Sequence, residues 1–183
     1  MRVIGGCARG HKLKTRKGMN TRPTADRVKE SLFNILAPFL EGCRFMDIFA
    51  GNGSIGIEAL SRGADYCVFI EKSHQCGKII KENLIFTGLS YKANLIISEA
   101  GAAITRMKKK ERFDIIFLDP PYHSTELAVV IEQISMSGLL IQDGLLVVEH
   151  NRQDNAWFDN QWTVFRDKIY GDTALTFLTP AAK

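Results

Sequence analysis

The feature that most constrains the fold is a glycine-rich turn between an apolar segment and a helical pattern. Residues 45–50 (FMDIFA) read as a strand, residues 51–56 (GNGSIG) hold three glycines, and residues 57–62 (IEALSR) have the spacing of a helix. Glycines let the backbone turn tightly and approach a ligand closely, and the start of the helix offers free N–H groups. The segment predicts a nucleotide-type cofactor loop at the end of a strand.

Two acidic residues bear on which cofactor this loop binds. The glycine spacing is also that of dinucleotide-binding folds, and Glu71 lies about 20 residues downstream, where it could accept the ribose hydroxyls of either cofactor. Asp47 precedes Gly51 by four residues, and a carboxylate there suits the ammonium of a methionine moiety but would repel a pyrophosphate. We therefore expect S-adenosylmethionine rather than a nicotinamide cofactor.

A second motif, Asp119-Pro120-Pro121-Tyr122, follows the apolar run 113–118 (FDIIFL). The two prolines fix two φ angles and remove two N–H donors, so the turn offers only acceptors, and Tyr122 adds an aromatic face beside them. An exocyclic amine on a nucleobase needs in-plane acceptors and a stacking partner. These four residues are the predicted catalytic set, and the alternative is a plain strand end followed by a Pro-Pro turn.

The carboxylate of Asp119 favours guanine as the acceptor base. The Watson–Crick edge of guanine presents two adjacent donors, N1–H and N2–H, which one carboxylate can accept together. Adenine presents one donor beside an acceptor, a pattern that suits an Asn amide better. The base must also leave any stack to reach the pocket, and Tyr122 would replace the lost stacking.

Apolar runs alternate with helical patterns along the whole chain. Helices are expected from Thr24 to a stop at Pro38 and near 54–62, 73–84, 100–109 and 124–137. Strands are expected at 45–50, 66–71, 94–98, 113–118 and 145–149, followed by a hairpin-like pair at 162–165 and 174–178. This order predicts an α/β domain with a doubly wound, mostly parallel sheet and an antiparallel C-terminal edge. We expect one domain over 1–183, composed of a basic N-terminal hairpin or arm (1–23) and a cofactor-binding and catalytic core (24–183).

The positive charge of the chain is concentrated near its start. The net charge is +4, but residues 1–29 carry +8 and the remainder −4. An excess of this kind, on a segment patterned as a hairpin, predicts a phosphate-binding arm, with an ordinary solvated basic tail as the alternative. The predicted RNA-binding residues are Arg2, Arg9, Lys12, Lys14, Arg22, Thr24 and Arg27. The last three could instead contact the cofactor carboxylate, or simply form a helix N-terminus.

Several stretches together resemble one enzyme family. Residues 21–36 (TRPTADRVKESLFNIL), 47–64 (DIFAGNGSIGIEALSRGA) and 119–122 are similar to the RsmD-type methyltransferases of bacterial 16S ribosomal RNA, and the similarity extends from residues 2–6 to 170–173. The resemblance implies the class I methyltransferase fold and transfer of a methyl group from S-adenosylmethionine to the N2 amine of one guanosine. It also implies 16S ribosomal RNA as the partner, within an assembling small ribosomal subunit.

The resemblance also extends the cofactor site beyond the first motif. Glu99 follows the 94–98 strand, where such proteins often place an Asp that contacts the adenine amine. The complete set of expected cofactor-binding residues is Asp47, Phe49, Ala50, Gly51, Gly53, Glu71, Lys72, Glu99, Ala100 and Asp119.

Composition limits the remaining alternatives. The chain is 45% hydrophobic, has no apolar run near 20 residues, and has four cysteines without metal-ligand spacing, so we expect a cytoplasmic protein without membrane or metal. A DNA adenine or cytosine amino-methyltransferase would share both motifs but would usually need more protein to read duplex sequence. A protein-glutamine methyltransferase would be expected to carry Asn in place of Asp119. A noncatalytic RNA-binding protein could keep the fold and the arm.

Overall fold

The computed structural model describes residues 1–16, 23–107, 111–121, 126–154 and 158–181, with the side chains of α1 described from residue 27 onward. The strands are β1 (Arg44–Ile48), β2 (Tyr66–Glu71), β3 (Ala93–Ile97), β4 (Phe113–Leu118), β5 (Leu140–Asn151), β6 (Trp162–Tyr170) and β7 (Thr173–Pro180). The helices are α1 (Pro23–Leu40), α2 (Ser54–Ser61), α3 (His74–Thr87), α4 (Ala100–Arg106) and α5 (Glu126–Ser137), with a 3-10 turn η1 (Ser90–Lys92).

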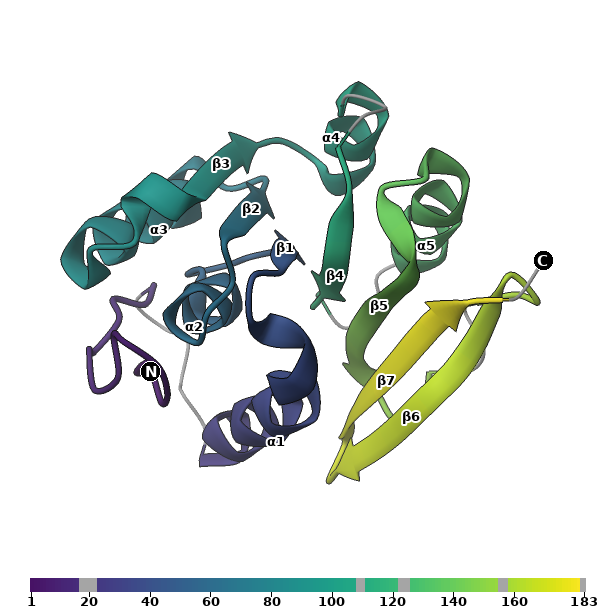
Figure 1. Ribbon diagram of the computed structural model, residues 1–183, viewed down its shortest axis with the longest axis horizontal. Helices are drawn as coiled ribbons and strands as arrows, with labels where there is room; N and C mark the ends of the chain where they lie inside the picture. Colours follow the sequence, from purple (N-terminus) through teal and green to yellow (C-terminus); the bar gives the residue numbers. More distant parts are fainter. Residues whose placement is uncertain (17–22, 108–110, 122–125, 155–157, 182–183) are drawn as a thin grey trace.

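All seven strands form one sheet in the order β3-β2-β1-β4-β5-β7-β6 (Figure 1). The first five strands are parallel, and β7 and β6 complete the sheet as an antiparallel edge. The order reverses between β1 and β4, which places a switch point at the centre of the sheet. In open parallel sheets ligands bind outside the carboxyl ends of the strands at such a point. The predicted doubly wound sheet with an antiparallel C-terminal edge is confirmed.

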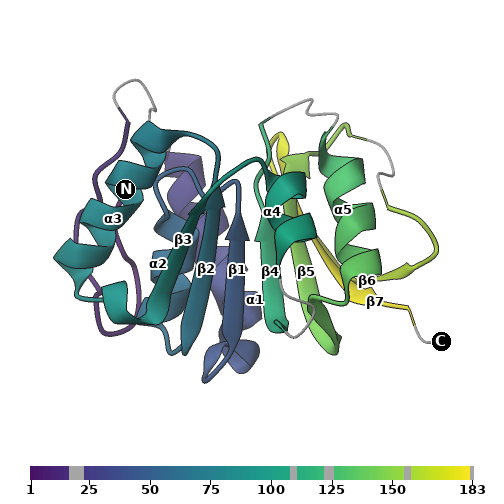
Figure 2. The same ribbon diagram turned by 90° about the horizontal axis from the view of Figure 1, so that it is seen from above.

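Helices cover both faces of the sheet (Figure 2). One apolar cluster packs α1, α2 and α3 on one face, through residues such as Phe33, Ile57 and Ile80. A second cluster packs α4 and α5 on the other face, through residues such as Ile104 and Val130. The near-continuous apolar runs of β1, β2, β4 and β5 follow from this arrangement, because a strand covered on both sides buries every side chain.

The helix boundaries lie within about three residues of those expected: α3 runs to Thr87 instead of Leu84, α4 ends at Arg106, and α1 passes Pro38. Gly88 has φ 72 and caps the end of α3. In contrast, α1 does not stop at Pro38 but continues to Leu40. Pro38 lies in the last turn, where it removes only one backbone donor, and Leu40 gains by being 2% exposed. Packing of the final turn therefore outweighs the helix-breaking tendency of proline.

The N-terminal segment, residues 1–16, contains a short hairpin. The backbone N–H of Val3 donates to the carbonyl of His11 at 3.0 Å, and that of Leu13 donates to Met1 at 3.0 Å. Val3, Ala8 and Leu13 are buried in the same cluster as α1, α2 and α3. The segment is thus packed against α1, α2 and α3, and its Lys and Arg residues lie on a backbone anchored by this packing.

None of the helices that the structure describes is long and apolar enough to cross a membrane. Within the same described ranges, no group of three or more His, Cys, Asp or Glu side chains is arranged to hold a metal ion.

Candidate cofactor and acceptor site

A cavity of about 630 Å³ opens at the carboxyl ends of β1, β2, β4 and β5. Eleven of the residues expected in the cofactor and catalytic sets line it: Asp47, Phe49, Ala50, Gly51, Glu71, Lys72, Glu99, Ala100, Asp119, Pro120 and Pro121. The two motifs, which are far apart in the sequence, therefore face one space. The side chain of Tyr122 lies outside the described residues.

The glycine loop owes its course to left-handed backbone conformations. Phe49, Gly51 and Gly53 have φ values of 64, 56 and 76, and Phe49 is a non-glycine residue in this unfavourable region. The carbonyl of Ala50 accepts a bond of 2.7 Å from the N–H of Gly53, which closes the turn. The loop is held in a tight shape that presents Ala50 and Gly51 to the cavity.

Two glycines of the motif act behind the loop rather than on the cavity. Gly53 is not among the lining residues; a Cβ there would lie 3.2 Å from Ile80 and 3.4 Å from Phe69. A Cβ on Gly56 would lie 2.3 Å from the ring of Phe69. These positions need glycine because α2 and α3 pack closely on β2 there.

Asp47 connects the end of β1 to the start of α2. Its Oδ2 accepts a hydrogen bond of 2.9 Å from the backbone N–H of Gly56, and the residue is only 2% exposed. Burial is the main cause that raises the pKa of Asp47 to about 7; the hydrogen bond from Gly56 opposes this increase, and the negative charges of Asp119 and Glu71 add to it. The ionised form of this carboxyl therefore requires a positive partner in the cavity.

Two backbone N–H groups orient the carboxylate of Glu71. Its two carboxylate oxygens accept bonds of 2.8 Å from the N–H groups of Gly51 and Ser73. Each oxygen keeps a lone pair for a second donor, so the carboxylate could still accept ligand hydroxyls. The exposed pair Lys72 and Glu99, with Nζ and Oε2 3.8 Å apart, brings two further predicted residues together at the rim.

Asp119, Pro120 and Pro121, the residues expected to hold the acceptor, line one part of the cavity. Asp119 is open to the cavity, but the surrounding protein desolvates its carboxyl and raises its pKa to about 6. Glu149, at the same edge on β5, also lines the cavity. Burial raises the pKa of Glu149 to about 8, and the negative charge of Asp119 raises it as well. Sequence analysis did not identify Glu149, although it directly follows the apolar run of a predicted strand.

The structure describes the side chains of five of the seven predicted RNA-binding residues, four on the N-terminal segment and one on α1. Arg2, Arg9, Lys12 and Lys14 lie on the exposed side of the N-terminal segment, and Lys14 pairs with Glu82 of α3 at 2.8 Å. Arg27 is exposed on α1. Arg22 and the side chain of Thr24 lie outside what the structure describes.

The N-terminal segment also reaches the cavity, which the sequence did not predict. Met1, Thr15 and Arg16 are among the lining residues. Asn83 of α3 holds this part of the segment, since it accepts from the N–H of Lys14 and donates to its carbonyl, at 2.8 and 3.1 Å. The same amide donates to the carbonyl of Asn52 in the glycine loop at 3.0 Å. One buried side chain therefore links the basic segment to the glycine loop.

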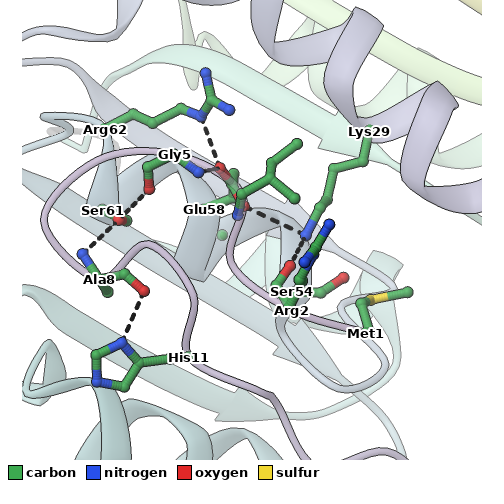
Figure 3. Close-up of polar contacts among 12 residues, drawn as sticks. Met1, Arg2, Gly5, Ala8, His11, Lys29, Ser54, Glu58, Ser61 and Arg62 are labelled. Atoms are coloured by element: carbon green, nitrogen blue, oxygen red, sulfur yellow. Dashed lines mark hydrogen bonds and ion pairs between the residues drawn. The ribbon is translucent and has the colours of Figure 1, made fainter.

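A buried ionic cluster holds the other part of the segment (Figure 3). The carboxylate of Glu58 on α2 accepts from the N–H groups of Ile4 and Gly5 at 2.8 and 2.7 Å. It also pairs with Lys29 of α1 and with Arg62 at 3.3 and 2.7 Å. We call Glu58, Lys29 and Arg62 the ionic clasp.

The charge of the cavity decides what it can hold. Asp47, Glu71, Glu99, Asp119 and Glu149 contribute five carboxyl groups, whereas Arg16 and Lys72 are the cations among the described lining residues. Buried carboxyls with raised pKa values are stabilised by a ligand that brings positive charge and hydrogen-bond donors. A ligand with a cationic group and sugar hydroxyls fits this arrangement, and a pyrophosphate does not.

Comparison with known proteins gives a consistent result over nearly the whole chain. The family described as conserved hypothetical protein 95 matches residues 1–179. YlbH of Bacillus subtilis (strain 168) is 42% identical over 154 residues, which cover 84% of each chain. The ribosomal RNA small subunit methyltransferase D of Escherichia coli (strain K12) is 34% identical over 175 residues, covering 95% of this chain and 87% of that protein. The solved structure of yhhF from Escherichia coli superposes with a TM-score of 0.87 at 33% identity, covering 100% and 99% of the two chains.

Proposed function

The chain belongs to the family of the ribosomal RNA small subunit methyltransferase D proteins, and we propose from this membership that it methylates small-subunit (16S) ribosomal RNA with S-adenosylmethionine as the methyl donor. The observation that carries the proposal is the cavity in which the glycine loop and the Asp119-Pro120-Pro121 turn meet. A cofactor site and an acceptor site are both needed for methyl transfer, and here they share one space.

The residues of the cavity match the groups of this cofactor. The sulfonium of S-adenosylmethionine supplies an activated methyl group, so the protein needs mainly to align the reacting atoms and keep them apart from water. Asp47 offers a buried carboxylate for the ammonium group, and Glu71, pinned by Gly51 and Ser73, offers free lone pairs to the ribose hydroxyls. Glu99 is the proposed partner of the adenine amine at the end of β3.

At the acceptor end, the proposed substrate atom is the exocyclic N2 amine of a guanosine. Asp119 would accept the N1–H and N2–H donors of the base edge, and the two prolines remove competing backbone donors from the turn. The ring of Tyr122 is proposed to stack on the extruded base. The carboxylate in this position supports guanine over adenine, for which an Asn amide would be the better complement.

The N-terminal segment is the proposed site of phosphate contacts. Arg2, Arg9 and Lys12 are exposed on a hairpin that is fixed to α2 and α3 and whose ends line the cavity. Binding of the RNA backbone there would bring a nearby nucleotide to the acceptor end. The proposed substrate form is 16S ribosomal RNA within an assembling small subunit in the cytoplasm.

The function is tested by nucleoside mass spectrometry of ribosomal RNA from cells with and without the gene for this chain. We expect one N2-methylguanosine to disappear from the small-subunit RNA and to return when the purified protein, S-adenosylmethionine and small-subunit particles are combined. Unchanged ribosomal RNA would contradict the assignment. Methyl label in DNA or in protein glutamine would instead favour one of the other amino-methyltransferase classes.

A further inference from the structure

Glu149 is a carboxyl group of the cavity to which neither motif assigns a role. It follows Val148, which pairs in register with Leu118 on the neighbouring parallel strand. Asp119 directly follows the last residue of β4, and Glu149 is the next residue on β5, so the two lie side by side where strands about 4.8 Å apart end. Phe117 and Val147, two residues earlier on each strand, both face the cluster of α1, α2 and α3. Asp119 and Glu149 both line the cavity, as Phe117 does.

The position of Glu149 is fixed, but its carboxyl group has no hydrogen-bond or ion-pair partner among the described residues. The backbone of Glu149 pairs with Leu175 of β7, so the strand is held on both sides. None of the hydrogen bonds or ion pairs between described residues involves the Glu149 carboxyl, and the negative charge of Asp119 repels it. A half-buried carboxyl group without a partner is stable only if it keeps a proton or meets a positive ligand.

The other charged groups near Glu149 do not neutralise it. Asp47 on β1 and Glu71 on β2 add negative charge to the cavity. His150, the next residue on β5, is bound to Thr176 of β7 through Nε2 at 2.9 Å. The cationic side chains among the described lining residues are Arg16 and Lys72, and Lys72 is paired with Glu99 at 3.8 Å. Asp119 is the charged group whose negative charge raises the pKa of Glu149.

We propose that Glu149 is a positioning residue of the acceptor site, which forms with Asp119 a carboxyl pair that takes up the proton released by the acceptor amine. The proposal rests on the proposed function, because the amine and the methyl donor are those of that reaction. It deepens that function by assigning the proton, which the Asp119 motif alone leaves unassigned.

The proton balance of the reaction gives the pair its role. As the N–C bond forms and the C–S bond breaks with its electron pair left on sulfur, the amine must lose one proton, and the Asp119 carboxylate receives it. At the same moment the cavity loses the positive charge of the sulfonium. Two neighbouring carboxyls then hold a proton more tightly, since like charges disfavour ionisation. The pair therefore gains basicity when the proton must be removed, and returns it to solvent when the products leave.

The same electrostatics make a prediction for binding alone. A cationic ligand beside the pair should expel a proton from it, whereas a ligand with a neutral sulfur should not. S-adenosylmethionine and S-adenosylhomocysteine differ in this charge but share the ammonium and adenosine groups. Any proton release caused by Asp47 and the shared ammonium group is the same for both compounds. The difference in proton release between them therefore reports on the carboxyls near the sulfur.

Proton release is measured by titration calorimetry at pH 7 in buffers of different ionisation enthalpy, without RNA. For the unaltered protein we expect S-adenosylmethionine to release about half a proton more than S-adenosylhomocysteine. In Glu149→Gln, which keeps the size of the side chain, this difference should fall to less than half of that value. The matched control is Glu132→Gln, an exposed position on α5, which should leave the difference unchanged.

The pH profile of single-turnover methylation of small-subunit particles provides the second measurement. Removal of the second carboxyl should shift the rising limb of the rate to lower pH by about one unit and reduce the plateau, because Asp119 then titrates alone. Glu149→Asp, which restores an ionisable group, should recover part of the proton difference. If neither S-adenosylmethionine nor S-adenosylhomocysteine bound to the unaltered protein, the proposed function itself would be overturned. Binding with equal proton release in the unaltered protein and Glu149→Gln would overturn only the role of Glu149.

Discussion

The Nζ atom of Lys29 lies 3.3 Å from Oε2 of Glu58, and their side chains are 3% and 0% exposed. This buried ion pair joins α1 to α2, and the same carboxylate accepts two backbone N–H groups of the N-terminal segment. Lys29 Nζ also donates to the carbonyl of Arg2 at 2.5 Å. The segment that lines the cavity through Met1 and Arg16 is thus attached to the core by charge as well as by apolar packing.

Replacement of Glu58 by Gln should destabilise the protein strongly, because Lys29 and Arg62 would lose their anionic partner in a buried environment. Removal of one partner from a buried pair costs about 3 to 5 kcal/mol. The free energy of unfolding, measured in urea, checks this. Glu82→Gln removes the exposed partner of Lys14 and should cost less than about 1 kcal/mol. Similar decreases in the free energy of unfolding for the two variants would show that the ionic clasp stabilises the protein no more than an exposed ion pair does.

Gly53→Ala should weaken S-adenosylmethionine binding by about tenfold or more, although Gly53 does not line the cavity. A Cβ at φ 76 is strained, and it would press on Ile80 and Phe69 and displace the loop. Gly171→Ala is a suitable control, since Gly171 has φ 61 but has no atom within 4 Å of an added Cβ. Calorimetry of folded variants should show lower affinity for Gly53→Ala and unchanged affinity for Gly171→Ala. Equal affinities would mean that the loop shape is not required.

The alternation of strands and helices could be predicted from the sequence because the signals are local. Continuous apolar runs indicate β1, β2 and β4, whose side chains are buried on both faces of the sheet. The glycines indicate the tight turn into α2. The convergence of Gly51 and Asp119 on one cavity also followed, since the carboxyl ends of parallel strands share an edge.

The ionic clasp could not be predicted in this way. Glu58 is 54 residues from Ile4, and nothing near it in sequence indicates that its carboxylate is buried under the N-terminal segment. Lys29 was counted among the positive charges expected to favour RNA, but it is 3% exposed and paired with Glu58. The charge of Lys29 is therefore neutralised within the fold, and residues 1–29 have less positive charge available for RNA than their composition suggested. A long-range ion pair has no periodic or spacing signal.

The exposed cations of the N-terminal segment should determine the salt dependence of RNA binding. Arg9→Glu with Lys12→Glu should lower affinity for small-subunit RNA and reduce the slope of log K against log salt by about 1 to 2, while cofactor affinity stays nearly constant. Arg166→Glu with Lys168→Glu, exposed on the far edge strand β6, makes the same charge change and should have a smaller effect. Filter binding over a salt series compares the two double variants. Identical slopes would show that RNA affinity depends on the net charge of the protein and not on the position of the cations.

The stability of the ligand-free protein should fall as pH rises through neutrality. The pKa of Asp47 is raised by burial from 3.8 to about 7, so the folded state holds its proton more tightly than the unfolded state. Its contribution to stability is fully present below the unfolded pKa and is lost as pH rises through the folded pKa. Asp47→Asn should therefore reduce the decrease in Tm between pH 5 and pH 8, and Asp143→Asn, an exposed control, should not. A wild-type pH dependence in Asp47→Asn would exclude this carboxyl as the cause.

Asp119 should be required for methyl transfer but not for cofactor binding. Without its carboxylate the base amine loses both its orientation and its proton acceptor, so Asp119→Ala should reduce the single-turnover rate by about 100-fold or more. Tyr122→Phe should keep a large part of the rate, because the aromatic face survives the change. Calorimetry first verifies that each variant binds S-adenosylmethionine, and digestion of labelled RNA to nucleosides then identifies the product. A fully active Asp119→Ala enzyme would remove Asp119 from the mechanism, and label in N6-methyladenosine instead of N2-methylguanosine would refute the choice of guanine.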